Sequence, residues 1–75
     1  MYLSNEQSRE IDERITAVGR EGGKRSVARI ASAAGVSTEF IRKLRRQHYL
    51  PTRMKENVER TTAWKVCRAL GLPLV

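Results

Sequence analysis

Residues 27–44 read VARIASAAGVSTEFIRKL, and this stretch decides the fold. Its first half carries apolar side chains at helical spacing and ends at Gly35, which can take the positive φ of a tight turn. Ser37 can then cap a second helix. Ala31 is small enough to let the two helices cross closely. The stretch therefore predicts a helix, a turn and a helix over about 27–47.

The second of these helices has two chemically different sides. Ile41 and Leu44 are expected to face the core, together with Val36 from the turn. The helix should end before Pro51, because a proline disfavours helical geometry in the residue preceding it. Polar side chains cover the outward side: Thr38, Glu39, Arg42 and Lys43.

A further helix is predicted before this segment by apolar residues at i, i+4 and i+7: Ile11, Ile15 and Val18. Ser4 can cap this helix, with Gln7 as its partner in a capping box, and Gly22-Gly23 ends it. Ser26 can cap the helix that follows. No strand-like alternation is sustained anywhere in the chain, so a sheet is not expected.

After Pro51 the pattern is thinner, and Met54 and Val58 suggest one short helix or an ordered turn. A last helix is predicted by four apolar residues on one stripe: Ala63, Val66, Cys67 and Leu70. Thr61 or Thr62 can cap it, and Gly71 can close it. We therefore expect a single all-α, compact domain of four to five helices spanning 1–75.

The positive charge is concentrated in the middle of the chain. The formal net charge is +7, made of −2 over 1–19 (two bases, four acids), +8 over 20–55 (ten bases, two acids) and +1 over 56–75 (three bases, two acids). Such a block repels itself unless a polyanion offsets it, which favours nucleic acid as the partner. A solvated, solubilising surface is the alternative.

Several classes of protein are not expected. One cysteine, Cys67, cannot form an internal disulfide, and with His48 it makes no zinc-ligand set, so we expect no metal, cofactor or small-molecule ligand. No apolar run reaches the length of a membrane span, and we expect a cytoplasmic protein. A single histidine and the lack of a paired carboxylate site argue against an enzyme.

The central segment resembles the helix-turn-helix of phage repressors and Cro proteins, through the spacing of Ile30, Ala31, Ala34, Gly35, Val36, Ile41 and Leu44. Residues 62–72 also look like the last helix of that family, which typically ends in Ala-Leu-Gly. The resemblance implies a compact lambda-repressor-like domain of five helices. It also implies a sequence-specific transcriptional regulator of phage or bacterial type that occupies a double-stranded DNA operator, most simply as a repressor, with activation or a role in recombination as alternatives.

Under this resemblance Ser37 starts the recognition helix, which spans 37–47. Arg42 could bond the O6 and N7 atoms of guanine, and Glu39 could accept from the N4 of cytosine or instead pair with Arg42 or Lys43. Thr38 could contact a thymine methyl group. The implied base contacts are Thr38, Glu39, Arg42 and Lys43.

Phosphate contacts are expected on both flanks of the recognition helix. The residues that open the preceding helix adjoin backbone amides that favour a phosphate, and basic residues follow the recognition helix. Any one of these cations could be only a solvated surface charge. The candidates are Lys24, Arg25, Ser26, Ser37, Arg46, Arg53 and Lys55.

Two roles of the C-terminal region stay open. An apolar tail, 72–75, favours a homodimer through 62–75, although the tail could also fold back on its own core. Trp64 is expected to fill the core and Tyr49 to pack, whereas His48 could pack or touch a phosphate. The alternative function is a protein-interaction module on the same fold, either antitoxin-like or a recruitment domain; RNA binding is weakened by the scarcity of aromatic residues.

Overall fold

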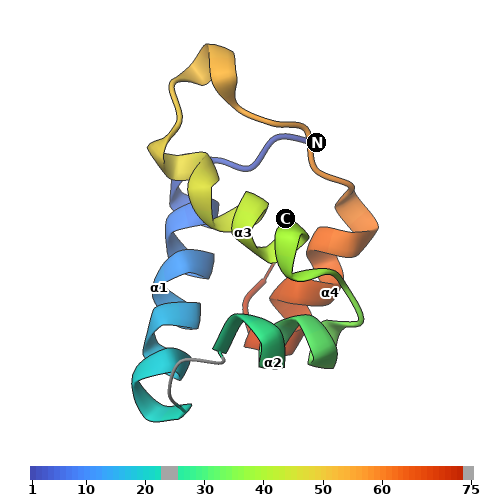
Figure 1. Cartoon of the computed structure of the whole chain (residues 1–75). Helices are drawn as coiled ribbons and strands as arrows, with labels where there is room; N and C mark the ends of the chain where they lie inside the picture. Colours follow the sequence, from blue (N-terminus) through green and yellow to red (C-terminus); the bar gives the residue numbers. More distant parts are fainter. Residues whose placement is uncertain (23–25, 74–75) are drawn as a thin grey trace.

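Four α-helices and two 3₁₀ turns make up the part of the chain that our computed structural model describes, residues 1–22 and 26–73 (Figure 1). No strand occurs among these residues, which confirms the all-α prediction. Their four α-helices lie within the predicted four to five, one fewer than the five that the resemblance implies. The elements are α1 (Asn5–Gly22), α2 (Ser26–Ala34), α3 (Thr38–Arg46), η1 (Gln47–Tyr49), η2 (Thr52–Met54) and α4 (Arg60–Leu70).

The start of α1 is fixed by the predicted capping box. The Gln7 backbone N–H donates to Ser4 Oγ at 3.0 Å, and the Ser4 N–H donates to Gln7 Oε1 at 2.9 Å. Two amides that would lack helical partners are thereby satisfied. The helix ends at Gly22, and the predicted terminator Gly23 lies outside the described residues.

The turn between α2 and α3 has the geometry that the sequence predicts. Gly35 takes a φ of 70°, and the amides of Gly35 and Val36 return to the carbonyls of Ser32 (3.2 Å) and Ala31 (2.9 Å). These two bonds make a Schellman closure of α2. Ser37 then caps α3, since its Oγ accepts from the Phe40 N–H at 3.2 Å. The orientation of α3 is thus set by hydrogen bonds on both sides of the turn.

Gly35→Ala is expected to lower the free energy of unfolding by about 1 to 2 kcal/mol, the usual cost of a left-handed backbone for an L-residue. An added Cβ would meet no atom within 4 Å, so the cost is conformational and not steric. Gly35→Asn, which tolerates this backbone better, is the control and should cost less. Urea unfolding of the native protein and the two variants measures the order of their stabilities. Equal stabilities would contradict the prediction.

The two helix starts at Ser26 and Arg60 differ from the predictions. Ser26 is the first residue of α2 and not the residue before it. α4 is capped by Glu59, whose carboxylate accepts from the backbone amides of Thr61 (3.1 Å) and Thr62 (2.6 Å), so the prediction of a threonine cap is wrong. A carboxylate accepts hydrogen bonds from these amides, and its negative charge is also attracted to the partial positive charge at the helix N-terminus.

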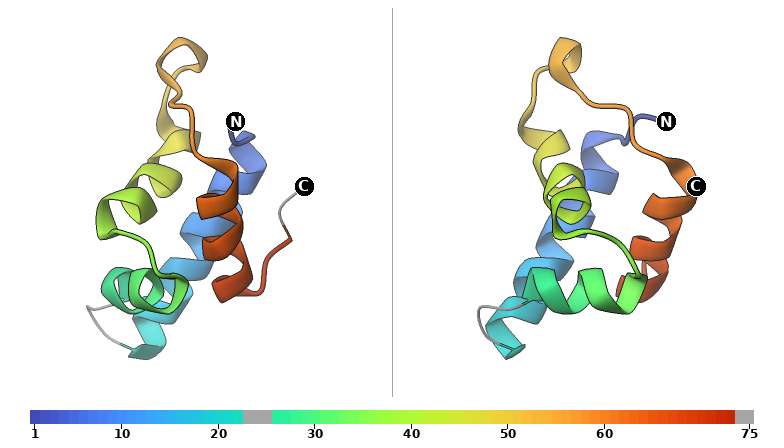
Figure 2. Two further views of the ribbon diagram at one scale, coloured as in Figure 1. Left: turned by 90° about the vertical axis from the view of Figure 1, so that its right-hand side faces the viewer. Right: turned by 45° about the vertical axis from the view of Figure 1, so that its right-hand side comes forward.

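The predictions for the end of α4 and for the segment that precedes this helix are confirmed in part. Gly71 closes α4 with a φ of 72°, as predicted. Between α3 and α4 the chain forms a loop that extends beyond the helices (Figures 1 and 2). The loop holds an ordered 3₁₀ turn at η2 and not a short α-helix, with Met54 exposed and Val58 buried. Val58 is anchored because its N–H donates to the Met1 carbonyl at 2.8 Å.

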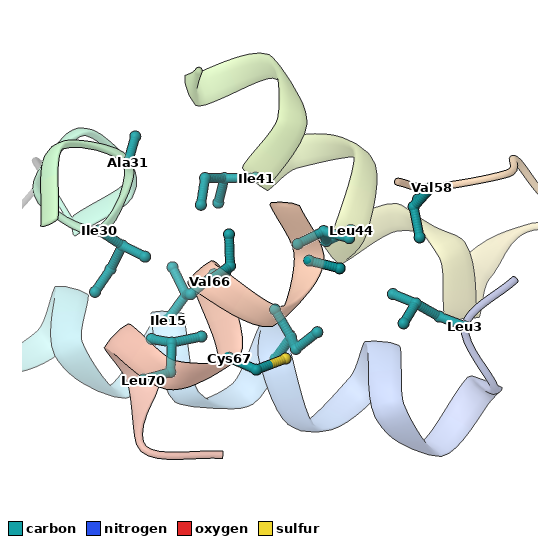
Figure 3. Packing of buried hydrophobic residues seen from close by; sticks show 12 residues of the cluster. Leu3, Ile15, Ile30, Ala31, Ile41, Leu44, Val58, Val66, Cys67 and Leu70 are labelled. Atoms are coloured by element: carbon teal, nitrogen blue, oxygen red, sulfur yellow. The ribbon is translucent and has the colours of Figure 1, made fainter. Parts of the chain in front are cut away.

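All four helices contribute to one apolar core. In Figure 3 α2 is seen nearly end-on while α3 crosses above α4, with Ile41 pointing toward Ala31 and Val66. Ala31 is buried at this crossing, as the sequence predicts, and Val36 and Phe40 pack against the core from its edge. The buried apolar residues are Leu3, Ile11, Ile15, Ile30, Ala31, Ile41, Leu44, Val58, Ala63, Val66, Cys67 and Leu70.

Trp64 and Tyr49 lie outside this core, so both packing predictions need correction. Trp64 is 47% exposed, because it stands beside the buried stripe of α4 and not on it. Tyr49 is 73% exposed. By contrast Cys67 is buried as predicted, and burial raises the pKa of its thiol. Leu72 packs against the core, which favours the folded-back reading for the part of the tail that is described.

Candidate nucleic-acid interface

The outward side of α3 carries the four predicted base-contact residues. The side chains of Glu39 and Arg42 are 77% and 56% exposed, whereas Thr38 and Lys43 are half-buried. Arg42 Nη1 lies 2.7 Å from Glu39 Oε1, so Glu39 adopts the ion-pair role that the sequence left open beside base contact. This bond uses Nη1 of the guanidinium and leaves Nη2 and Nε free to donate.

The arginines in the last turn of α3 form ion pairs that the sequence analysis did not predict. Arg45 Nε donates to Asp12 Oδ1 at 2.8 Å, and Arg46 holds both oxygens of Glu56 at 2.7 and 2.8 Å. With the Arg42 pair, three of the four cations of α3 therefore have carboxylate partners. Asp12 and Glu56 come from other segments of the chain, and they lower the local charge that a polyanion would meet. In the described chain only Lys43 of this set has no ion pair.

Asp12 on α1 forms polar contacts that link the end of α3 to α1. Besides Arg45, it contacts His48 Nε2 at 2.9 Å and accepts from the Tyr49 hydroxyl at 3.2 Å. Burial acts to raise the pKa of Asp12, but the hydrogen bonds from His48 and Arg45 outweigh it and hold the pKa below its ordinary value. His48 is thus packed against Asp12, with 9% of its side chain exposed. The Tyr49 ring lies against it, with centroids 3.9 Å apart.

Gln47 is a buried amide that joins α3 to the loop before α4. Its Nε2 donates to the Lys43 carbonyl at 2.8 Å and to Glu56 Oε2 at 2.7 Å, while its Oε1 accepts from the Glu56 N–H at 2.8 Å. Its backbone carbonyl also accepts from Lys55 Nζ at 2.8 Å. Both N–H groups and the oxygen of the side chain therefore have partners, and these bonds fix the base of the loop.

The predicted phosphate contacts divide into three groups. Lys24 and Arg25 lie outside the described residues. Arg46 and Lys55 are engaged: Arg46 with Glu56, and Lys55 with Asn5 Oδ1 and the Gln47 carbonyl. Arg53, Ser26 and Ser37 form no hydrogen bond or ion pair to another described residue through their side-chain donors. Arg53 is exposed on η2, Ser26 opens α2, and Ser37 uses its hydroxyl oxygen to cap α3 but keeps a proton to donate.

The residues that sequence reasoning missed here are Ser8, Asp12, Gln47 and Glu56. Ser8 is fully buried, donating to the Leu44 carbonyl at 2.6 Å and accepting from the His48 N–H at 3.0 Å. Most of the partners lie 8 to 40 positions apart in sequence. Hydrophobic periodicity reports only local structure, so no signal in the sequence pointed to these contacts.

Acid is expected to unfold the domain through three carboxylates. Hydrogen bonds from Arg46 and Gln47 lower the pKa of Glu56 to about 2, and those from Thr62 and Thr61 lower that of Glu59 to about 2. The pKa of Asp12 is lowered too. A depressed native pKa contributes stability that is present above the unfolded value, near 4.5 for Glu. This stability is lost as the pH falls from there through about 2.

Urea unfolding at pH 7, 4 and 2, followed by circular dichroism, tests this expectation. The free energy of unfolding should fall steadily below pH 5. The double variant Glu56→Gln, Glu59→Gln serves as the control, because it lacks two of the groups and should show a shallower pH dependence. A native protein equally stable at pH 7 and pH 2 would contradict the expected linkage.

No match to this chain was found among protein-family models, curated proteins or solved structures. Within residues 1–22 and 26–73, no helix is both long and apolar enough to cross a membrane. The same residues hold no group of three or more histidine, cysteine or acidic side chains able to bind a metal ion.

Proposed function

We propose that this protein binds double-stranded DNA in a sequence-specific way, inserts α3 into the major groove, and acts as a transcriptional regulator of phage or bacterial type. The observation that carries this proposal is the construction of α3. The helix buries Ile41 and Leu44 completely on one side and presents Glu39 and Arg42 on the other. A nine-residue helix anchored in this way suits a groove that admits one α-helix.

The anchoring of α3 supports base readout over a merely electrostatic grip. Ser37 caps its start, and Asp12 and Gln47 hold its end to α1 and to the following loop. Side chains on a fixed helix keep their geometry when DNA approaches, which is what discrimination between bases requires. Arg42, oriented by Glu39, is suited to the O6 and N7 atoms of guanine.

Arg53 is proposed to contact a phosphate beyond the C-terminal end of α3. It lies exposed in the η2 turn, on a loop whose base is fixed by Gln47 and Lys55. The described part of the interface is completed by Thr38, Lys43, Ser26 and Ser37. Arg46 and Lys55 would join only by exchanging their present partners, so we expect them to contribute less.

The second candidate, a protein-interaction module, would call for apolar side chains on the outward face of α3. Phe40 was the one residue available for this, and it packs against the core. The observation therefore favours DNA for α3. A homodimer through 62–75 stays a prediction. A symmetric dimer built on α4 would bring two identical surfaces together, each carrying the exposed cations Lys65 and Arg68.

Selection from a randomised duplex library, followed by titration of the enriched site at several salt concentrations, tests the proposal. We expect one short motif to be enriched, with affinity at least about 10³ above scrambled duplex. A pseudo-palindrome with half-sites one helical turn apart would favour a dimer, and a single half-site a monomer. Binding that is weak, wholly salt-driven and indifferent to sequence would contradict the proposal.

Arg42→Ala and Arg53→Ala form a matched pair within this experiment. Arg42→Ala should cost about 1 to 3 kcal/mol at one base position and relax the preference there. Arg53→Ala should weaken all duplexes alike and reduce the slope of log affinity against log salt by about 1. The opposite assignment of the two effects would show that α3 does not read bases.

A further inference from the structure

A second exposed face lies on α4, away from the α3 interface. Its residues stand at i, i+3, i+4 and i+7 and lie outside the buried stripe: Thr61, Trp64, Lys65 and Arg68. All four are exposed. In Figure 2 α4 and α3 occupy different sides of the domain, so DNA held by α3 would leave this face open.

Trp64 is the apolar feature of this face. It is the only tryptophan in the chain and is nearly half exposed. The guanidinium carbon of Arg68 lies 5.1 Å from the centroid of its ring, so one side of the indole is covered by a cation. Tryptophan and arginine are among the residue types most enriched at the energetic centres of protein interfaces.

The charges around Trp64 indicate what kind of partner fits. Arg60, Lys65 and Arg68 are exposed, and within the described chain none of them has an ion pair. The nearest acid in sequence is the capping residue Glu59, whose two oxygens are occupied by the amides of Thr61 and Thr62. The face therefore carries exposed cations without ion pairs in the described chain, arranged around one apolar ring.

Three occupants can be compared on this basis. A second copy of the chain joined symmetrically through this face would place one cationic patch against an identical cationic patch, which costs energy. Duplex DNA would satisfy the cations but stacks its bases inside the helix, so the indole would gain little. A peptide carrying carboxylates beside an apolar side chain satisfies both the cations and the ring.

We propose that the α4 face is a docking surface for an acidic peptide segment of another protein. An apolar side chain of the peptide stacks on Trp64, and its carboxylates pair with Lys65 and Arg68. This inference does not depend on DNA binding by α3. If both hold, the protein joins a DNA site to an acidic partner through two different helices.

Trp64 fluorescence provides a direct test in the full chain, because no other tryptophan contributes. The probes are three synthetic 12-residue peptides: one alternating Asp or Glu with Leu and Phe, one with Lys replacing each acid, and one with Ser replacing Leu and Phe. We expect a saturable blue shift with the acidic apolar peptide alone. The double variant Lys65→Glu, Arg68→Glu should bind it about tenfold or more weakly.

Arg53→Glu is the charge-reversal control, since it inverts one exposed cation on η2 and should leave peptide binding unchanged. Circular dichroism verifies that each variant folds. The proposal is overturned if no peptide shifts the emission, or if a 20-base-pair duplex produces the same shift and competes with the peptide. It is also overturned if the shift follows protein concentration alone and sedimentation reports a dimer.

Discussion

Gln47→Ala is expected to lower the free energy of unfolding by about 2 to 4 kcal/mol, which is large for a polar residue in so small a domain. The substitution removes the acceptor of the Glu56 N–H and the donor that steadies the Glu56 carboxylate. It also opens a gap where a completely enclosed side chain was packed. The loop from η1 to Val58 would then lose its attachment to α3.

Two measurements distinguish local opening of the loop from unfolding of the whole domain. Urea unfolding gives the stability, and limited trypsin cleavage after Arg53 reports the loop, because Arg53 is exposed at its tip. We expect cleavage in Gln47→Ala to be faster even where the helices remain folded. Gln47→Met keeps most of the volume but none of the hydrogen bonds, and should fall between the native protein and Gln47→Ala. A Gln47→Ala protein as stable as the native one would contradict this role.

The helices and their turns could be predicted from the sequence because their causes are local. The Ser4 and Gln7 capping box, the positive φ of Gly35 and Gly71, and the Ser37 cap each depend on residues within four or five positions. The buried stripes of α1 and α4 follow from helical spacing in the same way.

The failures at Glu59 and Trp64 also have physical reasons. A threonine at position 61 or 62 is a good cap by propensity, but Glu59 lies where its longer side chain reaches two amides and a threonine hydroxyl at once. Trp64 is apolar and adjoins the α4 stripe, yet residues one position off a helical stripe point sideways. Residue type alone could not decide either case.

The candidate interface was predictable as a surface but not as a set of charges. The outward position of Glu39 and Arg42 follows from helical periodicity. Helical periodicity does not predict the ion pairs of Arg45 with Asp12 and of Arg46 with Glu56. These acids lie in other segments and come close to α3 only when the whole chain has folded. The net charge of a segment is therefore a poor measure of the charge a ligand would meet, and this is why the salt dependence of binding must be measured.

Ile41→Ala is expected to lower the free energy of unfolding by about 3 to 4 kcal/mol, within the upper part of the range for truncating a buried isoleucine. Ile41 has no solvent exposure and joins α3 to Ala31 of α2 and Val66 of α4 (Figure 3). Truncation leaves a cavity where three helices meet. For a domain of this size the melting temperature should fall by roughly 15 to 25 °C. Ile41→Val, expected to cost about 0.5 to 1.5 kcal/mol, provides the graded control.

Ile41→Ala also distinguishes an effect on the fold from an effect on the proposed function, because Ile41 and Arg42 are adjacent in sequence but Ile41 is buried and Arg42 is exposed. Loss of Ile41 should reduce apparent DNA affinity only by the fraction of unfolded protein, with the preferred base unchanged. Loss of Arg42 should change the preferred base while leaving the melting temperature nearly constant, since its side chain is mostly exposed. Thermal unfolding and site selection on both variants test this contrast. A shift in base preference in folded Ile41→Ala would mean that the readout depends on how α3 is seated and not on its outward side chains alone.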